Sequence, residues 1–232
     1  MPEHIKKYLK LVEGMTDHAK YSNEELKDLI RNSDWIDDPI YRGTNYLKKK
    51  GIDYREIHVP SEGIRSKPLD VDIDIHNAIN ALSQKWLGIK IRNGLFCTTN
   101  IAQAESYGSV VLVLPLKGGR VYSAEGIGDY VEITDGKYSD VELENYIYHL
   151  YELKGDDTSY IGMDYGEFEE AIQQDKDFIS GFNEYLAENY LSILEERSPD
   201  YFGINEDELI IFGDVLMIER DYANSLGMDI IL

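Results

Sequence analysis

Three short segments carry the residue types that could do chemistry in this 232-residue chain. The first is Tyr41-Arg42-Gly43-Thr44, in which an arginine stands beside a glycine. A guanidinium can grip a diphosphate through two parallel hydrogen bonds, and a glycine lets a ligand come close to the backbone. The segment predicts an anion-binding strand end, whereas the simpler alternative is a solvated charge.

The second segment, Leu95-Phe96-Cys97-Thr98-Thr99-Asn100, places two hydroxyls together, and Tyr107 follows at the end of the next expected helix. Hydroxyls at a strand end can hydrogen-bond a catalytic carboxylate. A tyrosine ring at that distance can stack on a flat cationic ring. The structural alternative is a helix cap followed by a core tyrosine.

The third segment, Glu206-Asp207-Glu208, comes directly before an apolar run. Glu206 and Glu208 share one face at strand spacing, so both carboxylates can point at one reacting centre. Paired carboxylates suit an oxocarbenium-like transition state, where one stabilises the positive sugar and the other handles the acceptor. The alternative is an ordinary acidic lead-in to a strand.

Other common sites find little support in the sequence. It contains no Walker-type phosphate loop, no G-x-G-x-x-G, no H-E-x-x-H and no G-x-S-x-G. The five histidines show no metal-ligand spacing. The acidic residues Asp70, Asp72 and Asp74 precede an expected helix, and its positive dipole end explains them more simply than a magnesium site does. We therefore expect no metal.

Local patterns predict the elements that must position the first two segments. A short strand is expected at Ile40-Tyr41-Arg42, ending at Gly43. A helix is expected from Asp74 to Leu87, with Ile75, Ile79, Leu82 and Trp86 on its apolar face. A strand through residues 95–97, a cap at Asn100, a helix to Tyr107 and a strand from Val110 to Leu114 should follow.

The two ends of the chain also have readable patterns. The pattern of the first 33 residues predicts two helices, and the second begins with a capping box of Ser22 and Glu25. Near the C-terminus, Leu209–Phe212 and Val215–Ile218 predict a hairpin that turns at Gly213-Asp214. Between these ends, residues 140–200 predict an acidic helical insertion. The simplest organisation is one domain over residues 1–232, with residues 1–36 forming its N-terminal helices.

Charge restricts the partners. The formal net charge is -21, and residues 140–208 hold twenty acidic against three basic side chains, which is -17 of the total. The electrostatic field of so negative a protein repels phosphate backbones and attracts basic proteins. The charge therefore disfavours nucleic acid as the main partner, unless a basic patch such as Lys48–Lys50 assists. The acidic stretch is either a solvated helical face or a docking surface.

Cysteine content and hydropathy indicate the compartment. Cys97 is the only cysteine, so no disulfide can form within the chain and a thiolate-rich metal site is excluded. No apolar run approaches the roughly 18 residues that a membrane span requires. The segment from Met1 to Gly14 predicts an amphipathic, lysine-rich helix rather than a signal peptide. We expect a soluble, cytoplasmic protein.

Together and in this order, the three segments resemble the motifs of the mono-ADP-ribosyltransferase superfamily, which has an Arg or His strand, a Ser-Thr-Ser-like strand and a final Glu strand. Residues 41–44 look like the first motif of the arginine-specific branch, and Glu206-Asp207-Glu208 like its Glu-x-Glu strand. The spacing of Phe96 and Tyr107 is similar to that of the two nicotinamide-sandwiching tyrosines in the diphtheria-toxin-like branch. Residues 97–100 depart from the pattern because they lack serine.

The resemblance covers about a third of the chain and implies an α+β fold, a split β-sandwich that binds NAD as substrate. Arg42 would contact the phosphates and ribose, and the Gly43 backbone the carboxamide. Tyr107 would stack on the nicotinamide, paired with Phe96. Thr98 or Thr99 would hold the catalytic carboxylate.

The same resemblance assigns the catalytic roles. Glu208 would bind the ribose 2′-hydroxyl and stabilise the oxocarbenium as nicotinamide leaves, while Glu206 would orient or deprotonate an acceptor guanidinium. The implied activity is transfer of ADP-ribose to a protein acceptor, on arginine. Removal of Glu208 should then cost most of the activity with little loss of folding.

Two alternatives remain open. The same site would act as an NAD glycohydrolase if water were the acceptor. A different class of function, a non-catalytic acidic protein that docks on a basic partner, would leave the three motifs without a role.

Overall fold

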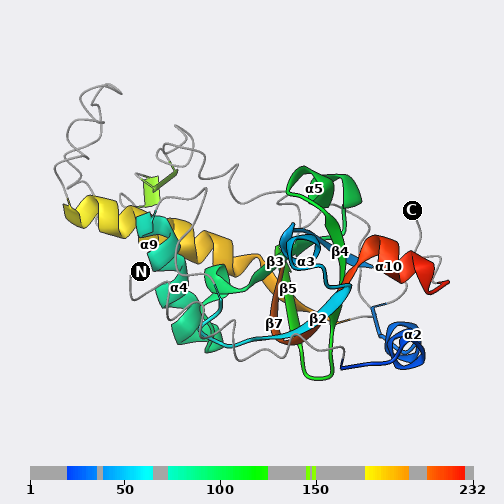
Figure 1. Cartoon of the computed structure of the whole chain (residues 1–232). Coiled ribbons are helices and arrows are strands. Elements are labelled where there is room, and N and C mark those ends of the chain that lie inside the picture. Colours follow the sequence, from blue (N-terminus) through cyan, green and yellow to red (C-terminus); the bar gives the residue numbers. More distant parts are fainter. Residues whose placement is uncertain are drawn as a thin grey trace, which may run out of the picture.

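The computed structural model describes residues 20–35, 39–64, 73–124, 145–146, 148–149, 176–198 and 208–227. These residues form a mixed α+β structure, in which helices surround an antiparallel sheet (Figure 1). The described strands are β1 Ile40–Gly43, β2 Tyr54–Val59, β3 Leu95–Thr98, β4 Val110–Pro115, β5 Arg120–Ala124, β6 Leu194–Arg197 and β7 Glu208–Glu219. The helices are α2 Asn23–Arg31, α3 Tyr46–Lys50, α4 Ile73–Leu87, the 3₁₀ turn η1 Ile91–Asn93, α5 Ile101–Ser106, α9 Lys176–Ser192 and α10 Arg220–Ser225.

Strand β7 organises the sheet because its two halves pair with different neighbours. Residues 208–212 pair with β3 and β5, whereas residues 213–219 pair with β2 and β4. Strand β1 joins the two halves, because it pairs with both β3 and β4. Strands β3, β1, β4 and β7 therefore form a closed circuit of pairings, and the sheet must curl around its inner face.

The predicted C-terminal hairpin is wrong, because residues 208–219 form one continuous strand. Gly213 has a φ of 96°, and a Cβ there would lie 3.0 Å from the Gly119 Cα. A hairpin would require the two apolar runs to pair with each other. Each run instead pairs with two other strands, which satisfies its backbone and buries its side chains. Gly213 thus accommodates a close approach within the strand rather than a reversal.

Most of the other local predictions are confirmed. Strands β1, β3 and β4 and helices α4 and α5 lie within a residue or two of their predicted bounds. Ser22 and Glu25 form the expected capping box, and Asn100 caps α5 by accepting from two backbone N–H groups. Trp86 was expected on the apolar face of α4, but its side chain is 50% exposed. Strands β2, β5 and β6 were not predicted.

Two apolar clusters pack against the sheet, and the alternation along β4 divides its side chains between them. Val111 and Val113 belong to the larger cluster, which includes α4 and α9, whereas Leu112 and Leu114 belong to the smaller one. The smaller cluster also takes side chains from α2, α5 and α10. Successive residues of a strand face opposite sides, so a strand that is apolar throughout is buried on both.

Helix α9 confirms part of the predicted acidic helical region. It lies beside α4 at one end of the sheet (Figure 1). Phe178, Phe182, Leu186 and Tyr190 of α9 join the larger apolar cluster, so this helix contributes to the main core. Strand β6 follows α9 and pairs with β5. The predicted first helix and most of residues 140–175 lie outside the described residues. Among the described helices, none is long and apolar enough to cross a membrane.

Candidate functional site

The strands that carry the three predicted motifs are neighbours in the sheet. Strand β3 pairs with β1 on one side and with the first half of β7 on the other. In these pairings Thr98 lies opposite both Tyr41 and Glu208. Thr98 and Glu208 are 110 positions apart in the sequence, yet directly opposite residues of an antiparallel pair have Cβ atoms only about 5 Å apart.

Arg42 does not share the sheet face of Thr98 and Glu208. Residues that lie directly opposite each other project from the same face, so Tyr41, Thr98 and Glu208 form one row. Arg42 follows Tyr41 and projects from the opposite face. There its positive charge acts on Cys97, whose thiol pKa burial nevertheless raises to about 12. The Arg42 guanidinium donates to the Phe96 carbonyl, which holds it at the boundary between β1 and β3.

The Thr98 hydroxyl joins β3 to the start of α5. It donates to Gln103 Oε1 at 2.6 Å and accepts from the Asn100 backbone N–H at 3.0 Å. The side chain is buried, and Thr99 follows the end of β3 with partial exposure. These two hydrogen bonds of the Thr98 hydroxyl thus organise the turn into α5.

Gly43 and Tyr107 meet where β1 packs against α5. A Cβ on Gly43 would lie 1.9 Å from the Ala104 carbonyl oxygen and 2.7 Å from the Tyr107 Cβ. The close approach that requires a glycine here is therefore that of α5. Tyr107 caps this helix at its C-terminal end, and 63% of it is exposed. Its position leaves the ring accessible to a ligand.

The carboxylate of Glu208 is held by an arginine that sequence analysis missed. Arg92 Nη1 and Glu208 Oε1 are 2.7 Å apart, with 4% of the arginine side chain and 19% of the glutamate side chain exposed. Arg92 lies in η1, just before β3. A buried ion pair needs good geometry because both charges give up hydration. Glu208 is thus fixed on one side and remains partly accessible.

Aromatic rings enclose the Arg92 guanidinium. Its central carbon lies 4.6 Å from the centre of the Phe96 ring and 5.8 Å from that of Tyr190 on α9. Burial alone would lower the pKa of Arg92, but the Glu208 carboxylate and the Tyr190 hydroxyl more than offset this and raise it. For Tyr190, whose charged form is the anion, burial raises the pKa. Arg92 therefore stays charged beside Glu208 at every relevant pH.

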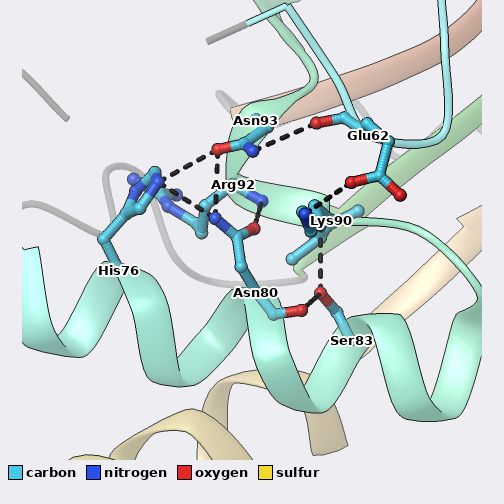
Figure 2. Close-up of polar contacts among 8 residues, drawn as sticks. Glu62, His76, Asn80, Ser83, Lys90, Arg92 and Asn93 are labelled. Carbon is cyan, nitrogen blue, oxygen red and sulfur yellow. Dashed lines mark hydrogen bonds and ion pairs between the residues drawn. The ribbon is translucent and has the colours of Figure 1, made fainter. Parts of the chain in front are cut away.

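A polar network fixes the turn that carries Arg92 (Figure 2). The Arg92 backbone N–H donates to Asn80 Oδ1 at 2.9 Å, and the Asn80 amide donates to Asn93 Oδ1 at 3.0 Å. His76 Nε2 lies 3.0 Å from both asparagine side chains. The neighbouring Ile91 N–H donates to the Ser83 hydroxyl at 3.1 Å. These contacts tie η1 to one face of α4, so the backbone of Arg92 has a fixed position.

The sequence around Arg92 gives no direct signal for a buried arginine. In Ile89-Lys90-Ile91-Arg92, apolar residues alternate with basic ones, which favours an exposed arginine before a strand. The better clue is the polar pair His76 and Asn80, which is buried on the apolar face of α4, because buried polar groups need partners. Only the packing of α4 against η1 identifies those partners.

The arrangement can stabilise positive charge. Glu208 presents a partly exposed carboxylate. Tyr107 presents an exposed ring at the C-terminal end of α5. Glu206, the second predicted carboxylate, lies outside the described residues. Within the part of the chain that the structure describes, no three His, Cys, Asp or Glu side chains group as metal ligands.

Comparison of the chain with models of protein families, with curated proteins and with solved structures gives no match.

Proposed function

We propose that this protein transfers ADP-ribose from NAD to an arginine of a protein acceptor. The observation that carries the proposal is the adjacency of the three motif strands, with Thr98 directly opposite Glu208. The three motifs lie far apart in the sequence. If their similarity to the family were due to chance, their strands need not be neighbours in the sheet. The curled antiparallel sheet, divided along β7, is compatible with the split β-sandwich that the resemblance implies.

The reaction would proceed by departure of nicotinamide. The glycosidic bond between the ribose C1 and the nicotinamide nitrogen breaks, and its electron pair leaves with nicotinamide. Positive charge then develops on the ribose, where the Glu208 carboxylate would stabilise it. A guanidinium nitrogen of the acceptor forms the new bond to C1 and loses a proton, which Glu206 would accept.

The face occupied by Arg42 imposes a condition on this mechanism. Arg42 starts on the opposite side of the sheet from Glu208, and its guanidinium reaches the edge between β1 and β3. A dinucleotide is long enough to contact both sides of a strand end. Arg42 would therefore bind the diphosphate, away from the reacting ribose, so its loss should affect NAD binding more than the chemical step.

Labelled NAD and a basic, arginine-rich protein provide the test. We expect label to be transferred by the wild-type chain and lost in Glu208→Gln, with Arg42→Lys raising KM for NAD more than it lowers kcat. An arginine-blocked acceptor should take no label.

Three outcomes would change the assignment. Free ADP-ribose without labelled protein would indicate a glycohydrolase. Labelling that persists in Glu208→Gln would remove Glu208 from the mechanism. A chain that neither binds nor consumes NAD, but captures a basic protein in a salt-sensitive way, would be a binding protein instead.

A further inference from the structure

We infer that Arg92 is a positioning residue for the Glu208 carboxylate, and that Tyr190 of α9 helps to hold Arg92 in place. The inference rests on the proposed function, since it assigns a role in the transfer reaction to a residue outside the three motifs. Neither residue belongs to the pattern that suggested the function.

The Glu208 carboxylate has a well-buried partner in Arg92. Glu208 begins β7, and a side chain at a strand end has more freedom than one in the middle of a sheet. The 2.7 Å contact from Arg92 Nη1 to Glu208 Oε1 removes that freedom on the buried side. A catalytic group must be held close to its productive geometry by neighbours that are themselves fixed.

Arg92 meets this requirement through three separate contacts. Its backbone N–H is bound by Asn80 of α4. Its guanidinium faces the Phe96 ring of β3, and it also donates to the Tyr190 hydroxyl of α9. Lysine could keep the charge but could not maintain the planar contacts. The identity of the residue, and not only its charge, should therefore matter.

Fold stability alone is a weak explanation for this pair. Replacing a buried ion pair by apolar groups of similar size is often neutral or stabilising, because desolvation of the two charges offsets their attraction. The carboxylate also keeps 19% of its side chain exposed, so it can meet a ligand while Arg92 holds it. An arginine placed behind a partly accessible carboxylate fits a site that uses the negative charge.

Tyr190 connects this site to the acidic region. It lies near the end of α9, which carries exposed acidic side chains on its outer face. Tyr190→Phe would delete only the hydroxyl and leave the buried ring. This variant therefore tests the hydrogen bond to Arg92 with little effect on packing.

The experiment compares kinetics of Arg92→Lys, Arg92→Met and Tyr190→Phe with those of the wild-type chain. We expect kcat to fall about tenfold or more in both Arg92 variants and several-fold in Tyr190→Phe, because misplacement of a catalytic group by about 1 Å can cost a hundredfold. KM for NAD should change by less than about twofold, as expected when only transition-state binding is lost.

The pH profile provides a second readout. In Arg92→Met the acidic limb of the pH profile of kcat should move to higher pH by about one unit. The reason is that the Arg92 cation favours the ionised form of the Glu208 carboxylate. Arg92→Lys should show a smaller shift. A purely structural role would leave the shape of the profile unchanged in the folded variant.

Arg120→Lys is the matched control. Arg120 also pairs with a glutamate, Glu196, at 2.8 Å and also lies over a tyrosine ring, that of Tyr122 at 5.1 Å. This pair joins β5 to β6 and is half exposed. The control variant should keep wild-type kcat, KM and pH profile.

The outcome separates the inference from the proposed function. If the wild-type chain transfers label but folded Arg92→Lys and Tyr190→Phe keep its kcat and pH profile, Arg92 has no positioning role. If the wild-type chain has no activity, the carboxyl ¹³C resonance of Glu208, identified by its loss in Glu208→Gln, still tests the contact. Its titration should move to higher pH in Arg92→Met, and an unchanged titration would overturn the inference.

Discussion

At the scale of single residues, the most informative feature is the environment of Glu208. A glutamate before an apolar strand is common in so acidic a chain, and its residue type alone says little. Its position opposite Thr98 and its contact with a buried arginine distinguish it. Both features arise from segments distant in the sequence. The same contact also changes what removal of Glu208 should do to stability.

We predict that Glu208→Ala destabilises the protein by about 3 to 5 kcal/mol, because it leaves the Arg92 charge buried without its carboxylate. The motif resemblance alone led us to expect little loss of folding. Glu208→Gln keeps an oxygen that can accept from Arg92 and should cost less. Urea unfolding followed by circular dichroism measures both. Equal stability of the wild-type chain and Glu208→Ala would mean that the ion pair contributes nothing to folding.

At the scale of elements, the contact between β1 and α5 fixes the position of β1, the strand that carries Arg42 and Gly43. Gly43 stands where the last turn of α5 approaches the strand most closely. In the sequence, Gly43 beside Arg42 suggests that a ligand can approach the backbone closely. The structure supplies another reason, because a side chain at this position would collide with backbone that cannot move independently of the helix.

We predict that Gly43→Ala destabilises the protein by about 2 to 3 kcal/mol, because overpacking forces the backbone apart. The added Cβ would be only 1.9 Å from the Ala104 carbonyl oxygen. Gly51→Ala is the control, since its Cβ would meet nothing within 4 Å and the cost is only that of a left-handed φ, about 1 kcal/mol. Thermal or urea unfolding compares them. Similar losses in both variants would show that α5 can shift to make room.

At the scale of the whole molecule, the closed circuit of strands encloses an apolar interior. Leu95 and Cys97 of β3 and Leu209 and Ile211 of β7 are all buried beside one another. Helices α4 and α9 pack into the same cluster as these residues, and α2, α5 and α10 pack into the smaller cluster (Figure 1). Access to these residues should therefore require disruption of the packing between strands and helices rather than movement of one loop.

We predict that Cys97 reacts with a thiol reagent only when the protein unfolds. Its side chain is buried, and burial raises the pKa of the thiol to about 12, so almost no thiolate forms at neutral pH. Because it is the only cysteine in the chain, the labelling rate reports one site. The rate should be negligible in buffer and rise with the unfolded fraction in urea. Labelling of the native protein at the rate of a free thiol would show that the sheet opens locally.

The sequence by itself determined features that depend on near neighbours. The capping box at Ser22, the cap at Asn100 and the strand and helix periods from residue 95 to 115 all follow from interactions within a few positions. These elements establish that the chain has both helices and strands, whereas the α+β class was implied by the motif resemblance. The three motif segments were also found this way, because each consists of consecutive residues.

Only the tertiary structure decided the features that depend on distant partners. The run at residues 208–219 became one strand because β3, β5, β2 and β4 satisfy its backbone. Arg42 took the opposite face from Glu208 because the register of β1 against β3 sets which residues project together. Arg92 became the partner of Glu208 because α4 and α9 enclose it. The physical reason is common to all three: pairing register and burial are set by segments whose approach no local pattern encodes.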